Sequence, residues 1–205
     1  MSFGLGQKFK DTDLSEQSAG SIPSTRMYDK AYGKTGWKAI TIRSLSIGQG
    51  EILVTPLQLA NQAAAIANEG YYITPHLNKH DSMRIHRHNL EIDKRHFEVV
   101  KTGMHRVMSN GTGRRYNIDS LYMAGKTGTV QNPHGRDHAI FIGFAPVENP
   151  QIAVAVVVEN AGFGATWACP VASMMIEQYL TGTVKRKDLR KRIGESVLNE
   201  SVKKW

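Results

Sequence analysis

Several features that would place a chain in a special structural class are scarce in this sequence. Its single cysteine, Cys169, excludes an internal disulfide. The longest apolar run, Ile152 to Val158, is much shorter than the roughly 18 residues that a membrane-spanning helix needs. The first residues lack the basic start and apolar core of a signal peptide. With only 19 Gly and 7 Pro, the chain is also neither collagen-like nor of low complexity.

What is present fits one globular domain, or most of one, because 40% of the 205 residues are hydrophobic. The charge is basic, with 26 Lys and Arg against 18 Asp and Glu, a net charge of +8. Six of the cations, with one acid, lie between Lys185 and Arg192. This stretch is typical of a solvated terminal helix or tail, or of a contact with a membrane surface or polyanion. No recognition helix or base-stacking aromatic sheet accompanies it, so we expect no nucleic-acid partner.

Five of the eight histidines crowd one polar stretch of the chain and raise the question of a metal site. They are joined by no cysteine and by no fixed ligand spacing, so the sequence predicts no metal site there. The five are His76, His80, His86, His88 and His96.

A capping signature marks the first predicted helix. Thr55 suits the N-cap, Pro56 the first helical position, and Gln58 can return a hydrogen bond to the cap. Apolar residues then recur at helical spacing as far as Gly70, which predicts a helix over residues 55–70. The same spacing predicts helices over residues 95–109 and 169–180.

The remaining segments divide into loops and strands. Residues 1–50 are rich in Gly, Ser, Thr and Lys, which predicts extended loops. Later apolar runs predict strands at 121–130, 138–147 and 151–160. The short connections between them favour an antiparallel meander, so the expected fold class is α+β, with helices covering an antiparallel sheet.

The first of these strands carries the tetrapeptide Lys126-Thr127-Gly128-Thr129, whose residue types suit a binding or catalytic site. A Lys-Thr-Gly strand is a component of serine acyl-transfer sites of the penicillin-recognising class. The ammonium supplies positive potential, the Thr hydroxyls can donate hydrogen bonds, and the glycine lets a flat substrate approach the strand edge. The same triplet occurs at residues 34–36, but in the loop-rich start of the chain.

The order of several motifs resembles that of class B penicillin-binding proteins. Residues 48–60, Gly-Gln-Gly-Glu-Ile-Leu-Val-Thr-Pro-Leu-Gln-Leu-Ala, resemble the segment before the family's third active-site motif, and residues 124–131 resemble that motif. The strands at 139–146 and 152–159 resemble the two that follow it. The opening Phe3-Gly-Leu-Gly-Gln7 and the turn at Asn149-Pro150 favour the elongation type, known as penicillin-binding protein 2.

This resemblance implies a peptidoglycan D,D-transpeptidase of the penicillin-binding protein and serine β-lactamase-like fold. By this resemblance, Lys126 would help to set the electrostatic potential of the site. The Thr127 and Thr129 hydroxyls would bind the terminal carboxylate of the donor peptide. The Thr129 backbone N–H would be an oxyanion donor, and Gly128 would lie against the substrate. The usual alanine after the motif is Val130 here, which would narrow the groove.

The resemblance also implies that part of the site is missing from the chain. The family's Ser-x-x-Lys and Ser-x-Asn motifs precede the matched region, no Ser-x-Asn occurs here, and we read the formal Ser-x-x-Lys at Ser201 as chance. We therefore interpret residues 1–182 as the C-terminal part of a transpeptidase domain, without a nucleophile and inactive alone. Residues 183–205 are interpreted as a basic tail. A β-lactam sensor or non-catalytic scaffold of the same fold remains the alternative.

The family's setting supplies expectations about partners and location. The resemblance implies a D-Ala-D-Ala stem peptide and β-lactams as ligands, no cofactor, and elongation-complex membrane proteins including a glycosyltransferase as partners. It implies the periplasmic face of the bacterial inner membrane, with an anchor upstream of this chain. Because the family's neighbouring strands lie upstream, the strand at 151–160 should have a bare edge, which favours self-association.

Overall fold

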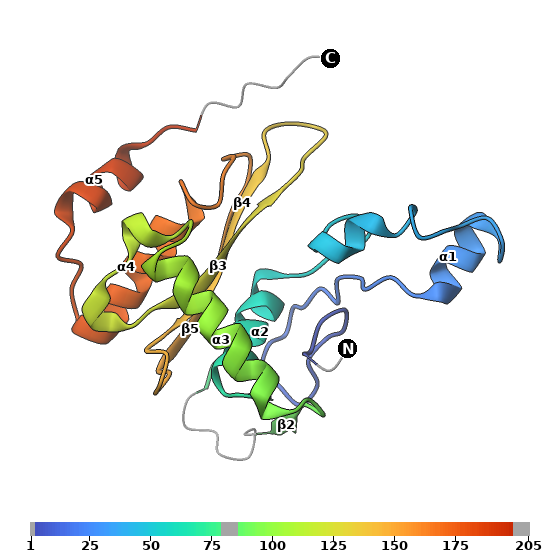
Figure 1. The fold of residues 1–205 in the computed structure, drawn as a ribbon, viewed down its shortest axis with the longest axis horizontal. Coiled ribbons are helices and arrows are strands. Elements are labelled where there is room, and N and C mark those ends of the chain that lie inside the picture. Colours follow the sequence, from blue (N-terminus) through green and yellow to red (C-terminus); the bar gives the residue numbers. More distant parts are fainter. Residues whose placement is uncertain (1–2, 79–85, 199–205) are drawn as a thin grey trace.

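The computed structural model describes residues 3–78 and 86–198 of the chain. These residues form five α-helices and five strands, joined by loops and a few short 3-10 turns (Figure 1). The helices are α1 (Thr25–Tyr32), α2 (Pro56–Ala67), α3 (Lys94–Ser109), α4 (Ala168–Thr181) and α5 (Lys187–Glu195). The strands are β1 (Tyr71–Ile73), β2 (Arg87–Asn89), β3 (Ala124–Val130), β4 (His138–Ala145) and β5 (Ile152–Val158).

The main sheet is the predicted antiparallel meander, in the order β3-β4-β5. Ala124 pairs with Phe144 at one end of the β3–β4 ladder, and Val130 pairs with His138 at the other. In the described part of the chain β3 and β5 are the two edges of this sheet, so the expected bare edge of the third strand is present. The small sheet of β1 and β2 has no counterpart in the sequence prediction.

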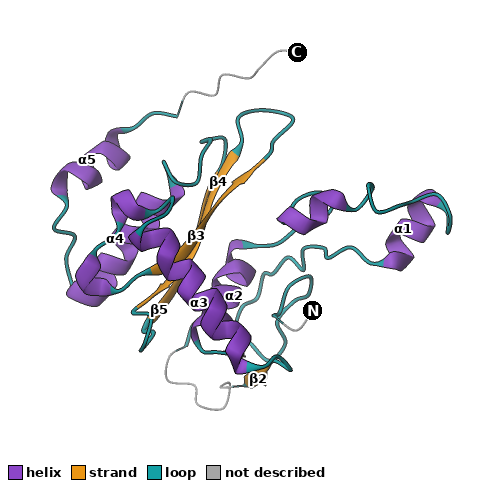
Figure 2. Cartoon of the chain, viewed as in Figure 1, coloured by secondary structure: helices purple, strands orange, loops and turns teal. Residues whose placement is uncertain are grey.

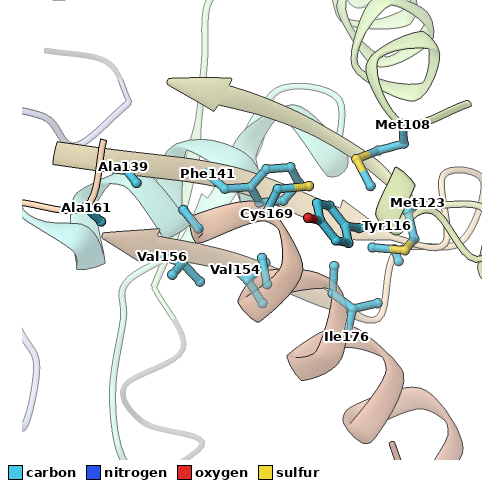
Figure 3. Close-up of a cluster of buried hydrophobic side chains, with 13 residues drawn as sticks. Met108, Tyr116, Met123, Ala139, Phe141, Val154, Val156, Ala161, Cys169 and Ile176 are labelled. Atoms are coloured by element: carbon cyan, nitrogen blue, oxygen red, sulfur yellow. The ribbon is translucent and has the colours of Figure 1, made fainter. Parts of the chain in front are cut away.

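Helices cover both faces of the main sheet (Figure 2). One face packs against α4 in a core around Phe141 and Cys169, which are fully buried (Figure 3). The other face packs against α2 through Phe144 and Ile66. The alternation of side chains along β4 explains this arrangement, because Phe141 and Phe144 point to opposite faces. The α+β layout expected from the sequence is therefore confirmed.

The predicted elements are present with shifted ends. Helix α2 has the predicted capping box of Thr55 and Gln58, but it ends at Ala67, before the predicted Gly70. The first strand begins at Ala124 instead of residue 121, because residues 119–121 form a 3-10 turn and Tyr122 adopts a left-handed conformation with φ 43°. The second strand ends two residues earlier than predicted, and the third begins one residue later and ends two residues earlier.

Residues 3–50 run mostly as loops away from the sheet, and α1 lies at the far end of this arm (Figure 1). Helix α1 was not predicted, although Ser24 caps it by accepting a hydrogen bond from the Met27 N–H. An aromatic cluster lies beside it, in which Tyr28 contacts Tyr32 and Trp37. Nearer the start, Phe9 is buried against Tyr72, so part of this segment packs on the domain.

The basic stretch after α4 is attached to the domain. Helix α5 lies beside α4 (Figure 1), and Leu189 is partly buried against the main core. The Arg186 guanidinium pairs with Glu177 at 2.9 Å, and the Glu177 side chain is only 5% exposed. This buried ion pair fixes the path of the chain into α5.

Among the described residues no helix is long and apolar enough to cross a lipid bilayer.

Candidate active site

The predicted tetrapeptide lies on β3, at the edge of the main sheet. Lys126 and Gly128 pair with Ile142 and Ile140 of β4, so these four residues share the sheet face turned toward α2. A groove of about 880 Å³ runs between this face and the loop of residues 47–54 that precedes α2. All four residues of the tetrapeptide line the groove, and Val130 lines it too.

Lys126 is the exposed cation of this groove. Its side chain emerges from the strand, and its ammonium donates a hydrogen bond to the Thr127 carbonyl. No carboxylate of the described residues lies within ion-pair distance of the Lys126 ammonium. The groove therefore carries an uncompensated positive charge beside a strand edge, which suits an anionic group bound along that edge.

The Thr127 hydroxyl is hydrogen-bonded to Thr112, a residue that the sequence analysis did not predict as part of the site. Its Oγ1 lies 2.8 Å from the Oγ1 of Thr112, which follows α3, and the Thr127 residue is only 9% exposed. A Cβ at Gly111 or Gly113 would approach neighbouring atoms within 3.0 Å, so the tight turn around Thr112 requires these glycines. The signal in the sequence was the Gly-Thr-Gly spacing directly after the predicted helix.

Thr129 is fixed from two sides. Its Oγ1 accepts a hydrogen bond from the Gly164 N–H, and its carbonyl accepts one from the Gln49 side chain, both at 3.4 Å. A Cβ at Gly164 would lie 2.2 Å from the Gly128 carbonyl oxygen, so only glycine allows this approach. Gln49 is a second residue that the sequence prediction missed, although Gly48 and Gly50 on either side have positive φ angles, as a tight loop requires.

The glycine of the motif itself has space. A Cβ at Gly128 would lie 3.5 Å from the Ile140 Cβ, which is an ordinary contact. Packing within the described chain therefore does not demand glycine at this position. The open face above Gly128 belongs to the groove, where a bound chain could approach the strand.

The cysteine and two of the histidines are buried or hydrogen-bonded outside this groove. Burial raises the pKa of the Cys169 thiol to about 12, so this residue is a core side chain without thiolate character. The His76 ring bonds the Thr74 carbonyl and the His88 ring bonds the Thr74 hydroxyl, both at 2.8 Å. Among the described residues no three His, Cys, Asp or Glu side chains gather as metal ligands would, and His80 lies outside the described residues.

Comparison with known proteins gives the same family throughout. The penicillin binding protein transpeptidase domain matches residues 1–177. The chain is 33% identical to the peptidoglycan D,D-transpeptidase MrdA of Haemophilus influenzae, covering 87% of this chain and 31% of that protein. It thus spans about a third of the length of this curated relative.

Solved structures show the same fold. PBP2 of Pseudomonas aeruginosa is 38% identical with a TM-score of 0.76, covering 91% of this chain and 43% of that one. PBP2 of Helicobacter pylori, solved in complex with MreC, is 26% identical with a TM-score of 0.75, covering 88% of this chain and 34% of that one. The fold, the order of the motifs and these matches agree, and the chain belongs to the penicillin-binding protein transpeptidase family.

Proposed function

We propose that this chain supplies the Lys-Thr-Gly half of a peptidoglycan D,D-transpeptidase site of the elongation type. The observation that carries the proposal is the tetrapeptide on an edge strand beside a groove of about 880 Å³. The positive charge of Lys126 there is not paired with a carboxylate of any described residue. In the reaction a serine attacks the D-Ala-D-Ala peptide bond, the terminal D-Ala leaves, and an amine of a neighbouring strand takes over the acyl group. The described chain contributes the surface that would hold the donor peptide.

Each residue of the tetrapeptide has a role in this proposal. Lys126 supplies the positive potential for the donor's terminal carboxylate. Thr127 and Thr129 donate hydroxyl hydrogen bonds to it, and the Thr129 N–H is an oxyanion donor. Gly128 leaves room for the peptide to lie along the strand.

The bonds behind the two threonines support these roles. Thr129 accepts from the Gly164 N–H, so its own hydroxyl proton stays available for a ligand. Where Thr112 donates to Thr127, the Thr127 proton is available in the same way. The arrangement fixes the positions of both hydroxyl oxygens before a ligand arrives, and such preorganisation is the condition for electrostatic stabilisation of an anion.

The nucleophile belongs to another segment in this proposal. The described residues contain no Ser-x-x-Lys sequence, and the formal copy at Ser201 lies outside them. We expect the 205-residue chain to form no covalent adduct with a fluorescent penicillin, and a version extended upstream by a Ser-x-x-Lys segment to be labelled. A labelled band from the short chain, lost on mutation of one of its own serines, would contradict the assignment.

Structures of two relatives in complexes suggest which proteins bind the complete protein to which this chain belongs. We propose that it works with elongation-complex membrane proteins, including a glycosyltransferase, at the periplasmic face of the inner membrane. PBP2 of Helicobacter pylori with MreC supports such an assembly, as does a 27% identical neighbour in a peptidoglycan synthase complex.

The bare edge of β5 should recruit another strand. We expect the isolated chain to self-associate, and sedimentation as a monomer at high concentration would contradict this.

A β-lactam sensor or scaffold of the same fold is the second candidate, because the groove can bind without turnover. The upstream sequence distinguishes the two. A membrane anchor and pedestal domain before Ser-x-x-Lys would favour the transpeptidase, and a signalling domain would favour the sensor.

A further inference from the structure

A second cleft lies away from the candidate active site, between the turn η3 (Arg114–Tyr116) and the start of α5. Its volume is about 660 Å³. Whereas the groove beside β3 is on the α2 side of the sheet, this cleft adjoins Tyr116, whose side chain belongs to the core on the α4 side (Figure 3). The cleft is lined by Arg115, Tyr116, Lys185, Arg186, Lys187, Asp188, Leu189 and Arg192.

The charges around this cleft are unbalanced. Five of its eight lining residues are cations and one is an acid. Arg186 is neutralised by Glu177, which leaves four cations against Asp188, a net charge of +3. Within the described chain none of these four has a carboxylate at ion-pair distance. Like charges held together cost free energy, so a bound anion would stabilise this arrangement.

The cations come from segments about 70 residues apart, and the three arginines among them contact the protein through their side chains. Arg186 donates to the Tyr116 carbonyl at 3.2 Å and to the Ser173 hydroxyl at 2.9 Å, which ties the basic segment to the core. Arg192 donates to the Tyr116 hydroxyl at 3.1 Å. Arg115 and Arg192 both lie near the Tyr116 ring, at 5.9 and 5.6 Å from its centroid. These contacts organise the cleft before any ligand binds, unlike the cations of a solvated tail.

We propose that this cleft binds a phosphate group. Two guanidinium groups and two ammonium groups around one hollow match an anion with several acceptor oxygens, because guanidinium forks bond such oxygens in pairs. The same chemistry is found on a free phosphate compound and on an anionic lipid headgroup. The site is independent of the transpeptidase proposal, since it shares no residue with the groove beside β3.

The experiment uses the whole 205-residue chain with inorganic pyrophosphate as the probe, followed by calorimetry and by NMR of the backbone amides. We expect saturable binding that weakens with added salt, with shifts at Tyr116 and Lys187. The double variant Arg115→Gln/Lys187→Gln removes two lining cations that make no hydrogen bond through their side chains in the described chain. It should bind at least about tenfold more weakly, since charge-assisted hydrogen bonds are lost.

Arg190→Gln/Lys191→Gln is the matched control, because it removes two exposed cations from the same helix outside the cleft. Asp188→Asn, which removes the one lining carboxylate, should tighten binding. Vesicles of phosphatidylglycerol form the second arm: cleft-dependent binding to them without binding of pyrophosphate assigns the phosphate to a lipid headgroup. Absence of saturable binding in both arms, or equal weakening by the cleft and control variants, would overturn the proposal.

Discussion

The triplet Lys-Thr-Gly occurs twice in this chain, and the two copies differ in almost every structural respect. Residues 34–36 follow α1, are exposed, and form a turn closed by a hydrogen bond of 3.0 Å from the Gly36 N–H to the Gly33 carbonyl. Residues 126–128 lie on β3, paired residue by residue with β4 and bordering a groove. The chemistry available to a short motif is therefore set by the element that carries it.

The glycines show the contrast most clearly. A Cβ at Gly36 would lie 1.8 Å from the Tyr32 carbonyl oxygen, whereas one at Gly128 would meet nothing nearer than 3.5 Å. Glycine is thus required by local packing in the first copy. In the second copy packing within the described chain leaves the position open.

The largest expected difference between the copies concerns the lysines. In a version of the protein extended upstream to include Ser-x-x-Lys, we expect Lys126→Ala to slow acylation by a fluorescent penicillin by about a hundredfold, the order found when a preorganised electrostatic donor is removed. Lys34→Ala should leave the rate unchanged. Equal rates for the two variants would break the comparison.

The glycines should differ next, in stability. Gly36→Ala forces the turn to move off the Tyr32 carbonyl and should destabilise the α1 region by about 1–3 kcal/mol. Gly128→Ala should change stability by less than about 0.5 kcal/mol. The Trp37 indole NMR signal reports on the first region during urea titration, and amide exchange in β3 reports on the second. A greater loss from Gly128→Ala would contradict the role given to local packing.

The threonines should differ by a smaller amount. Thr127→Val removes a buried hydroxyl paired with Thr112 and should cost about 1 kcal/mol of unfolding free energy. Thr35→Val changes an exposed turn residue and should have almost no effect. Chemical denaturation measures both.

If the Thr112 pairing orients Thr127 as proposed, Thr112→Val should also slow acylation of the upstream-extended protein while Thr112→Ser preserves the rate. A Thr112→Ser variant as slow as Thr112→Val would refute that orienting role.

The smallest expected effect is a loss of stability at alkaline pH, and it is confined to the region around the first copy of the triplet. Burial, followed by its 2.7 Å hydrogen bond to Glu51, raises the pKa of Tyr28 from 10.0 to about 12. The folded protein keeps this proton at a higher pH than the unfolded chain, so the stability from Tyr28 is complete below about pH 10 and is lost toward pH 12. Ultraviolet titration against Tyr28→Phe measures this, and a normal titration of Tyr28 would contradict it.

Much of the fold was predictable because it follows from local rules. The capping box at Thr55, the helical spacing of apolar residues and the short links between strands each depend on neighbours in sequence. They correctly indicated three helices, three antiparallel strands and the strand that carries the motif. The order of motifs also indicated the family.

Local rules failed where contacts come from distant residues. Strand β1, for example, depends on pairing with β2 across residues 74–86. The start of the first strand shifted because Tyr122 adopts a left-handed conformation that its residue type does not favour. These positions follow from packing of separate segments, which periodicity does not report.

The sequence by itself determined the class of fold, the family and the four residues of the motif, because element types depend on neighbouring residues and the family on the order of motifs along the chain. Only the tertiary structure decided which side chains surround those four residues. It placed Thr112 behind Thr127 and Gln49 against Thr129. It also brought Arg115 beside a basic segment 70 residues later in the chain. The physical reason is that hydrogen bonds and electrostatic interactions depend on distances between side chains in space, which the folded packing of the elements sets.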